Sequence, residues 1–89
     1  MFNTIIKRDG RTAAYDVEKI ARAIFRAATS VGGKDSQTAY RLALQVQQRL
    51  EEKYPPSHLP TVEQIQYMVE KVLIENGHSR TAKEYILYR

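Results

Sequence analysis

The chain has 89 residues, of which 43% are hydrophobic and 27% charged, so we expect one small globular domain, smaller than a typical enzyme with its own substrate cleft. The net charge of +4 favours an anionic partner, whether a nucleotide, a nucleic acid or an acidic protein surface. The absence of cysteine excludes disulfides and thiolate metal sites, and no apolar run suits a membrane span (roughly 20 residues) or a signal peptide, so we expect a cytoplasmic protein.

The first predicted element is a β-hairpin with strands at residues 2–8 and 11–15. Asp9-Gly10 lies between these extended segments, and an Asp-Gly pair is the strongest short-range signal for a tight type I′ turn, because both residues tolerate positive φ. This turn would place Arg8 opposite Arg11. An isolated hairpin is only marginally stable in water, so its apolar side chains should pack on helices.

Residues 17–31 are predicted to form the first helix, because their apolar side chains recur with the helical period. Asp16 is the expected N-cap, with its carboxylate accepting a backbone N–H of the first turn. Gly32-Gly33 supplies the left-handed conformation that ends the helix. A short link then leads into the next helix.

The second helix is predicted over residues 36–54, with Asp35 as its N-cap and Pro55-Pro56 as its end. Its apolar stripe should face the core. Tyr40 and Leu44 lie off that stripe, so we expect them to contact the hairpin or another helix.

Residues 55–60 are expected to form a loop, after which Thr61 and Gln64 have the spacing of a capping box that opens a third helix over residues 62–75. Asn76-Gly77 ends it, and a fourth helix begins near residue 78 or 79. That helix reaches Arg89 without a cap or breaker, so we expect residues 1–89 to be one domain at the N-terminus of a longer protein. The predicted fold is α+β and mostly helical, with an N-terminal β-hairpin followed by four short helices.

Four cations, Lys7, Arg8, Arg11 and Lys19, should gather where the hairpin meets the positive end of the first helix dipole, which would make an anion site. Lys19 is unusual, because a cation in the first turn opposes the dipole and glutamate or glutamine is preferred there. A bound phosphate would relieve this conflict. In the alternative interpretation, the hairpin cations are simply solvated and Lys19 pairs with Asp16.

The sequence has no pattern typical of catalysis or metal binding. Val31-Gly32-Gly33-Lys34 does not have the spacing of a phosphate-binding loop, and the two histidines, His58 and His78, are placed like loop or cap residues, so we predict no metal site. The acidic residues are scattered singly, without the paired carboxylates of acid and base catalysis. We therefore expect no catalysis within these residues.

The run Lys-Arg-Asp-Gly-Arg at residues 7–11, followed by Asp16 and Lys19-Ile20, resembles the opening motif of the ATP-cone, the N-terminal nucleotide-binding regulatory domain of ribonucleotide reductases. The resemblance continues through residues 60–66, 75–78 and 81–89. It implies a non-catalytic domain that binds ATP or dATP with Mg²⁺ as an allosteric effector and controls a catalytic domain in the same chain. An anaerobic or cobalamin-dependent reductase, with nucleotide-dependent oligomerisation, is the parent protein that the resemblance favours.

Residue roles follow from the same resemblance. The positions that match the nucleotide-binding residues of the family are Lys7, Arg8, Gly10, Asp16, Lys19, Ile20 and Thr61. The first two would contact the phosphates, the glycine would form the turn, Asp16 and Lys19 would lie near the ribose and phosphates, and Ile20 would pack on the base. As an N-cap, Thr61 has its hydroxyl occupied, so the helix N-terminus would contact phosphate in its place. Further candidates are Arg11, Lys83, Tyr85 and Arg89.

Two other functions fit some of these features. A repressor of reductase genes can carry an ATP-cone after a zinc ribbon, but no cysteine precedes Lys7 in this chain. A small basic nucleic-acid-binding module would place base-reading side chains on one exposed helix, whereas the cations here are spread over several elements. The net charge of +4 does not distinguish a nucleotide from a nucleic acid as the partner.

Overall fold

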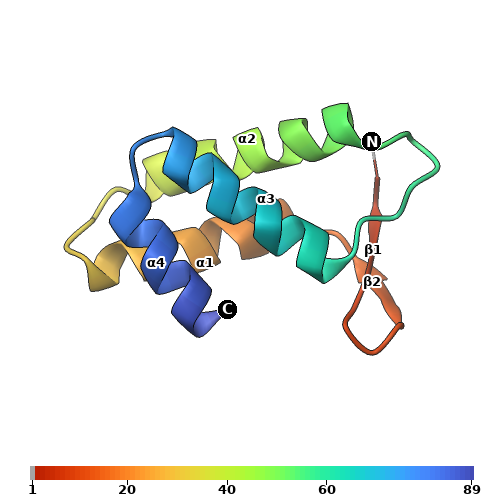
Figure 1. Cartoon of the computed structure of the whole chain (residues 1–89), viewed down its shortest axis with the longest axis horizontal. Coiled ribbons are helices and arrows are strands. Elements are labelled where there is room, and N and C mark those ends of the chain that lie inside the picture. Colours follow the sequence, from red (N-terminus) through yellow and green to blue (C-terminus); the bar gives the residue numbers. More distant parts are fainter. Residues whose placement is uncertain (1) are drawn as a thin grey trace.

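The computed structural model describes residues 2–89. Its elements, in chain order, are β1 (Thr4–Ile6), β2 (Thr12–Ala14), α1 (Val17–Ser30), α2 (Ser36–Lys53), α3 (Val62–Glu75) and α4 (Ser79–Tyr88) (Figure 1). The predicted α+β fold, a hairpin followed by four helices, is confirmed. None of the helices in the described part of the chain is long and apolar enough to cross a membrane.

The hairpin has a different turn from the predicted one. Gly10 has a φ of 89°, but no residue other than glycine has positive φ in the described chain, so Asp9 cannot occupy a type I′ position. The N–H of Gly10 donates to the carbonyl of Lys7 at 2.9 Å, and the N–H of Lys7 donates to the carbonyl of Arg11 at 2.6 Å. The loop is therefore Arg8-Asp9-Gly10, with glycine in the left-handed position after a type I turn. Lys7 lies opposite Arg11, and the predicted pairing of Arg8 with Arg11 is wrong.

The helix starts agree closely with the predicted caps. Asp16 accepts the N–H of Glu18 at 2.9 Å, and Asp35 accepts the N–H groups of Gln37 and Thr38. The capping box of Thr61 with Gln64 is complete. Such caps stabilise a helix by about 1 kcal/mol each because they satisfy N–H groups that have no partner inside the helix.

The core lies between the helices. Helix α1 packs against α2 and α4, and α3 packs against the same two helices from the other side (Figure 1). The most deeply buried side chains, none more than 1% exposed, are Ile24, Ala43, Val46, Leu50, Val69, Val72 and Leu73. Burying each of the larger ones contributes about 1.5–3 kcal/mol, so these helices form the stable frame of the domain.

Two apolar residues of α2 remain at the surface. Tyr40 is 43% exposed and Leu44 is 40% exposed. We expected them to contact the hairpin or another helix. Tyr40 lines an open groove together with residues of α1. The hairpin packs at the far end of α2 (Figure 1).

The hairpin is fixed to the helical frame at two points. Phe2 is buried and its ring meets that of Tyr15 edge-on, with centroids 4.5 Å apart. The N–H of Ile6 donates to the carbonyl of Pro60 at 3.0 Å, and Ile6 forms a parallel bridge with Thr61. The end of β1 therefore lies beside the first residue of the α3 cap.

Candidate functional site

A cavity of about 240 Å³ lies where the hairpin meets α1, α3 and α4. Its apolar wall includes Ile5, Ile20, Ala23, Val62 and Ile65. Its polar lining comprises Lys7, Asp16, Lys19 and Gln66. The cavity is smaller than the roughly 300–1,000 Å³ typical of small-molecule pockets, so it can enclose only part of such a ligand.

Two lysines stand at this cavity without a close ion-pair partner among the described residues, although the charge of Lys7 acts on the nearby Asp9 carboxyl. Lys7 and Lys19 are both exposed, and neither forms an ion pair with any residue in 2–89. Asp16, which also lines the cavity, has Arg22 as its nearest cation, with Nη2 3.9 Å from its carboxylate. The alternative in which Lys19 pairs with Asp16 is therefore not formed. Both ammonium groups remain available for an external anion.

The N-terminus of α3 adds backbone donors beside these cations. The hydroxyl of Thr61 accepts the N–H of Gln64 at 3.1 Å, and the N–H of Ile65 donates to the carbonyl of Thr61 at 3.0 Å. Within residues 2–89, this leaves the N–H groups of Val62 and Glu63 in the first turn without a partner. Unpaired N–H groups at a helix N-terminus favour a bound anion.

Two arginines lie at the edge of the site and meet on one glutamine. Arg8 has Nε 3.5 Å from a Glu63 carboxylate oxygen, and its Nη2 donates to Gln66 Oε1 at 3.3 Å. Arg89 donates to the same oxygen at 3.4 Å, and its Nε lies 2.9 Å from the Glu70 carboxylate. Arg8 thus reaches the site only through Gln66 and is held by α3. Sequence reasoning missed Gln66, although the helical period places it one turn after Val62, on the same face.

Of the remaining predicted residues, Tyr85 lines the cavity and Arg11 does not. Tyr85 lines the cavity and is buried, and burial, together with the nearby Glu70 charge, raises the pKa of Tyr85 to about 12. Arg11 instead bonds Asp9 at the turn, through its N–H at 3.0 Å and its Nε at 2.8 Å. These bonds hold the pKa of the Asp9 carboxyl below its usual value.

The structure therefore brings only part of the predicted set together. Lys83 is exposed on α4 and, like Gly10 and Arg11, is not among the residues that line the cavity. Those that do line it are Lys7, Asp16, Lys19, Ile20 and Tyr85. The arrangement has an apolar interior and a rim of cations and helix N–H groups, which suits a ligand that has both an apolar and an anionic part.

Comparison with known proteins identifies close relatives of the whole chain. It is 40% identical over 94 residues to the vitamin B12-dependent ribonucleoside-diphosphate reductase of Thermoplasma acidophilum, a match that covers 100% of this chain. It is 33% identical over 95 residues to the ribonucleoside-diphosphate reductase subunit alpha of Chlamydia trachomatis, covering 97% of this chain. It is 29% identical over 85 residues to the anaerobic ribonucleoside-triphosphate reductase of Haemophilus influenzae, covering 96% of this chain.

The matched regions are small parts of these relatives, since they make up 12%, 9% and 12% of the three proteins in the same order. The chain thus spans about a tenth of the length of the reductases that it matches. The model of the ATP cone domain family, in contrast, matches residues 3–89, which is nearly all of the chain. The chain belongs to the ATP cone domain family.

Proposed function

We propose that this domain binds ATP or dATP in the cavity between the hairpin, α1, α3 and α4, and thereby controls a ribonucleotide reductase of which it forms part. The observation that carries the proposal is the pair of lysines, Lys7 and Lys19, that line one apolar cavity without a close ion-pair partner among the described residues. A cation in the first turn of a helix opposes the dipole by about 0.3–1 kcal/mol, and a bound anion beside it would offset that cost. A nucleotide supplies both the apolar ring and the negative charge that this arrangement lacks.

The size and polarity of the site favour one orientation of the ligand. A cavity of about 240 Å³ would hold the base and part of the sugar, with the base against Ile20 and Ile65. The phosphates would then extend over the exposed rim, towards Lys7, Lys19 and the free N–H groups of α3. Arg8 would join them after release from Glu63.

The site supports binding without hydrolysis. Among residues 2–89, Asp16 is the single carboxylate that lines the cavity, and it already accepts the N–H of Glu18. No group of three or more His, Cys, Asp or Glu that could hold a metal ion occurs in the described part of the chain. Mg²⁺ would therefore be held by the phosphates of the nucleotide, where it reduces their negative charge.

A sensor without chemistry can act only through a difference in affinity between two states of the protein. The relatives that this domain matches are reductases, so the two states would be an active and an inactive form of such an enzyme. A change of association between subunits is one physical way to separate them. Light scattering and reductase activity of the parent protein, measured across ATP and dATP titrations, test this part of the proposal, which fails if neither quantity changes.

Isothermal titration calorimetry of the 89-residue chain with ATP and with dATP, each in the presence of Mg²⁺, tests the binding itself. We expect saturable heat with both nucleotides and no release of phosphate over the titration. Absence of heat with both would remove the proposal. A parallel titration with duplex DNA, analysed as log affinity against log salt, separates a nucleotide site from a nucleic-acid surface, because phosphate-backbone binding weakens steeply with salt.

A further inference from the structure

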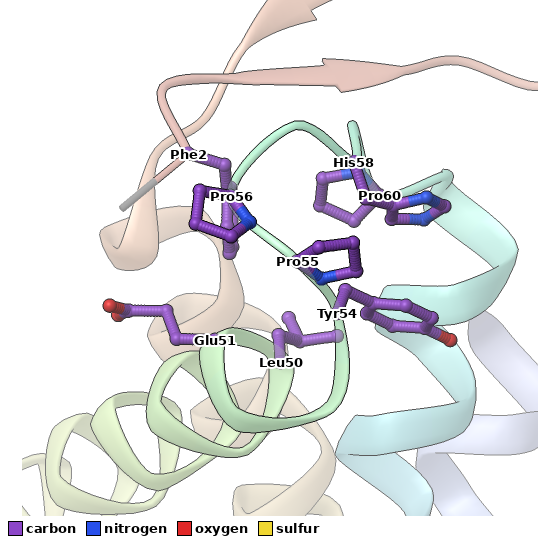
Figure 2. Close-up of a pocket in the computed structure, with 8 residues that line it drawn as sticks. All are labelled: Phe2, Leu50, Glu51, Tyr54, Pro55, Pro56, His58 and Pro60. Atoms are coloured by element: carbon purple, nitrogen blue, oxygen red, sulfur yellow. The ribbon is translucent and has the colours of Figure 1, made fainter.

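His58 lies in the loop between α2 and α3, outside the nucleotide cavity, and makes two specific contacts. Its ring is half-buried and stacks on Tyr54, the C-cap residue of α2, with centroids 4.4 Å apart and planes 20° from parallel. Its Nε2 lies 2.8 Å from the side-chain oxygen of Gln64. Figure 2 shows His58 and Tyr54 among prolines and Phe2, around a second cavity of about 220 Å³.

The direction of the His58 hydrogen bond follows from the groups around Gln64. The backbone N–H of Thr61 can only donate, and it lies 3.0 Å from the same Gln64 side-chain atom, so that atom must be the amide oxygen. An amide oxygen can only accept. The imidazole must therefore donate from Nε2, which fixes its neutral tautomer as the form with hydrogen on Nε2.

The oxygen that His58 holds also closes the capping box of α3. Gln64 accepts the N–H of Thr61 through it, while the Gln64 N–H donates to the Thr61 hydroxyl at 3.1 Å. The His58 bond thus restrains the side chain that fixes the first turn of α3. Because this bond is half-buried, losing it leaves a polar group poorly solvated.

The capping box in turn sets two parts of the nucleotide site. Thr61 pairs with Ile6, the residue before Lys7, and the N–H of Ile6 donates to Pro60. Thr61 also precedes Val62, which lines the cavity and whose N–H has no partner within residues 2–89. A shift of Thr61 would therefore move a cation and the helix donors together.

We propose that His58 is a positioning residue for nucleotide binding: by donating from Nε2 to Gln64 it holds the first turn of α3 and the end of β1 in the arrangement that receives the phosphates. This inference rests on the proposed function. His58 contributes no contact to the ligand. Its stacking on Tyr54 ties the loop to the end of α2, and its donor ties the same loop to the start of α3.

Two substitutions separate the ring from the donor. His58→Phe keeps an aromatic ring on Tyr54 but removes the donor, whereas His58→Gln places an amide N–H near the position of Nε2 without the ring. Calorimetric titration of each 89-residue variant with ATP and Mg²⁺ should give about two- to tenfold weaker binding for His58→Phe and near wild-type binding for His58→Gln, because one hydrogen bond is at stake. His78→Phe is the matched control, since His78 at the start of α4 makes no side-chain capping bond, and it should bind as wild type does.

Equal affinity of His58→Phe and wild type would overturn the proposal, and so would equal losses for both His58 variants, which would assign the effect to ring packing. A measurement on the wild type does not depend on either variant folding: ¹⁵N NMR of the imidazole should show hydrogen on Nε2 in the neutral form, and hydrogen on Nδ1 alone would also overturn it. If the wild type binds no nucleotide, the proposed function fails. Amide hydrogen exchange at Thr61, expected to be faster in His58→Phe than in His58→Gln, still tests the positioning contact in that case.

Discussion

Replacing Lys19 with glutamine should make the nucleotide-free domain more stable and its nucleotide complex weaker. Lys19 is the third residue of α1, where the N–H groups and the dipole make the local potential positive. Its side chain is exposed and has no ion-pair partner within residues 2–89. A glutamine side chain at this position could also accept the N–H of Asp16, as the third residue of a capping box does, whereas lysine can only donate.

The size of each effect follows from this geometry. Removing the unfavourable charge from the first turn should stabilise the domain by about 0.3–1 kcal/mol, which raises the Tm of a domain of this size by roughly 1–8 °C. For a phosphate contact from an exposed lysine, the effective dielectric constant lies between that of bulk water and that of a protein surface. Such a contact contributes about 1–2 kcal/mol. Affinity for ATP should therefore fall by about five- to thirtyfold.

The assay combines thermal melts with and without saturating ATP and Mg²⁺ with calorimetric titration of wild type and Lys19→Gln. Lys34→Gln, in the link between α1 and α2, makes the same charge change away from the cavity and should leave affinity nearly unchanged. The reasoning is refuted if Lys19→Gln melts lower than wild type without nucleotide and binds ATP as tightly. Lys19 would then be a structural residue, and the phosphate site would have to be built from Lys7, Arg8 and the α3 N-terminus.

Three further outcomes are expected. Gly10→Ala should lower the free energy of unfolding by about 1 kcal/mol, because alanine is strained at a φ of +89°. A Cβ at this position would meet no atom within 4 Å, so no steric clash adds to the effect, and an unchanged midpoint of urea unfolding would contradict this prediction. Glu63→Gln should tighten ATP binding two- to threefold by calorimetry (about 0.5 kcal/mol), since it releases Arg8 and removes a negative charge beside the phosphates, whereas Glu75→Gln, at the other end of α3, should not. The free energy of unfolding should fall as the pH rises from about 10 to about 12. A tyrosine in the unfolded chain loses its proton near pH 10, whereas burial raises the pKa of Tyr85 in the folded domain to about 12. In this range the folded state therefore retains a proton that the unfolded state releases. Between pH 8 and pH 11.5, the free energy of unfolding in urea should decrease by about 2 kcal/mol less in Tyr85→Phe than in wild type. Equal decreases in the two proteins would show that Tyr85 is not responsible.

The sequence alone determined the features that depend on a few neighbouring residues. The caps at Asp16, Asp35 and Thr61 are local, because each side chain reaches an N–H two or three residues further on, and the structure has all of them. The helical period located the core stripes for the same reason. The family motif likewise placed Lys7, Lys19 and Ile20 at one cavity, since hairpin and first helix are consecutive in the chain.

Which distant residues meet depends on how the elements pack together. Leu44 is as apolar as the buried residues of α2, yet it remains 40% exposed. Arg8 carries the charge expected of a phosphate ligand, but Glu63 and Gln66, more than 50 positions away, hold it on α3. The contacts of Arg8 depend on how the hairpin docks beside Thr61. The contacts that link His58 through Gln64 to the end of β1 depend on the same docking. Docking is set by many long-range contacts together, which a local sequence pattern cannot predict.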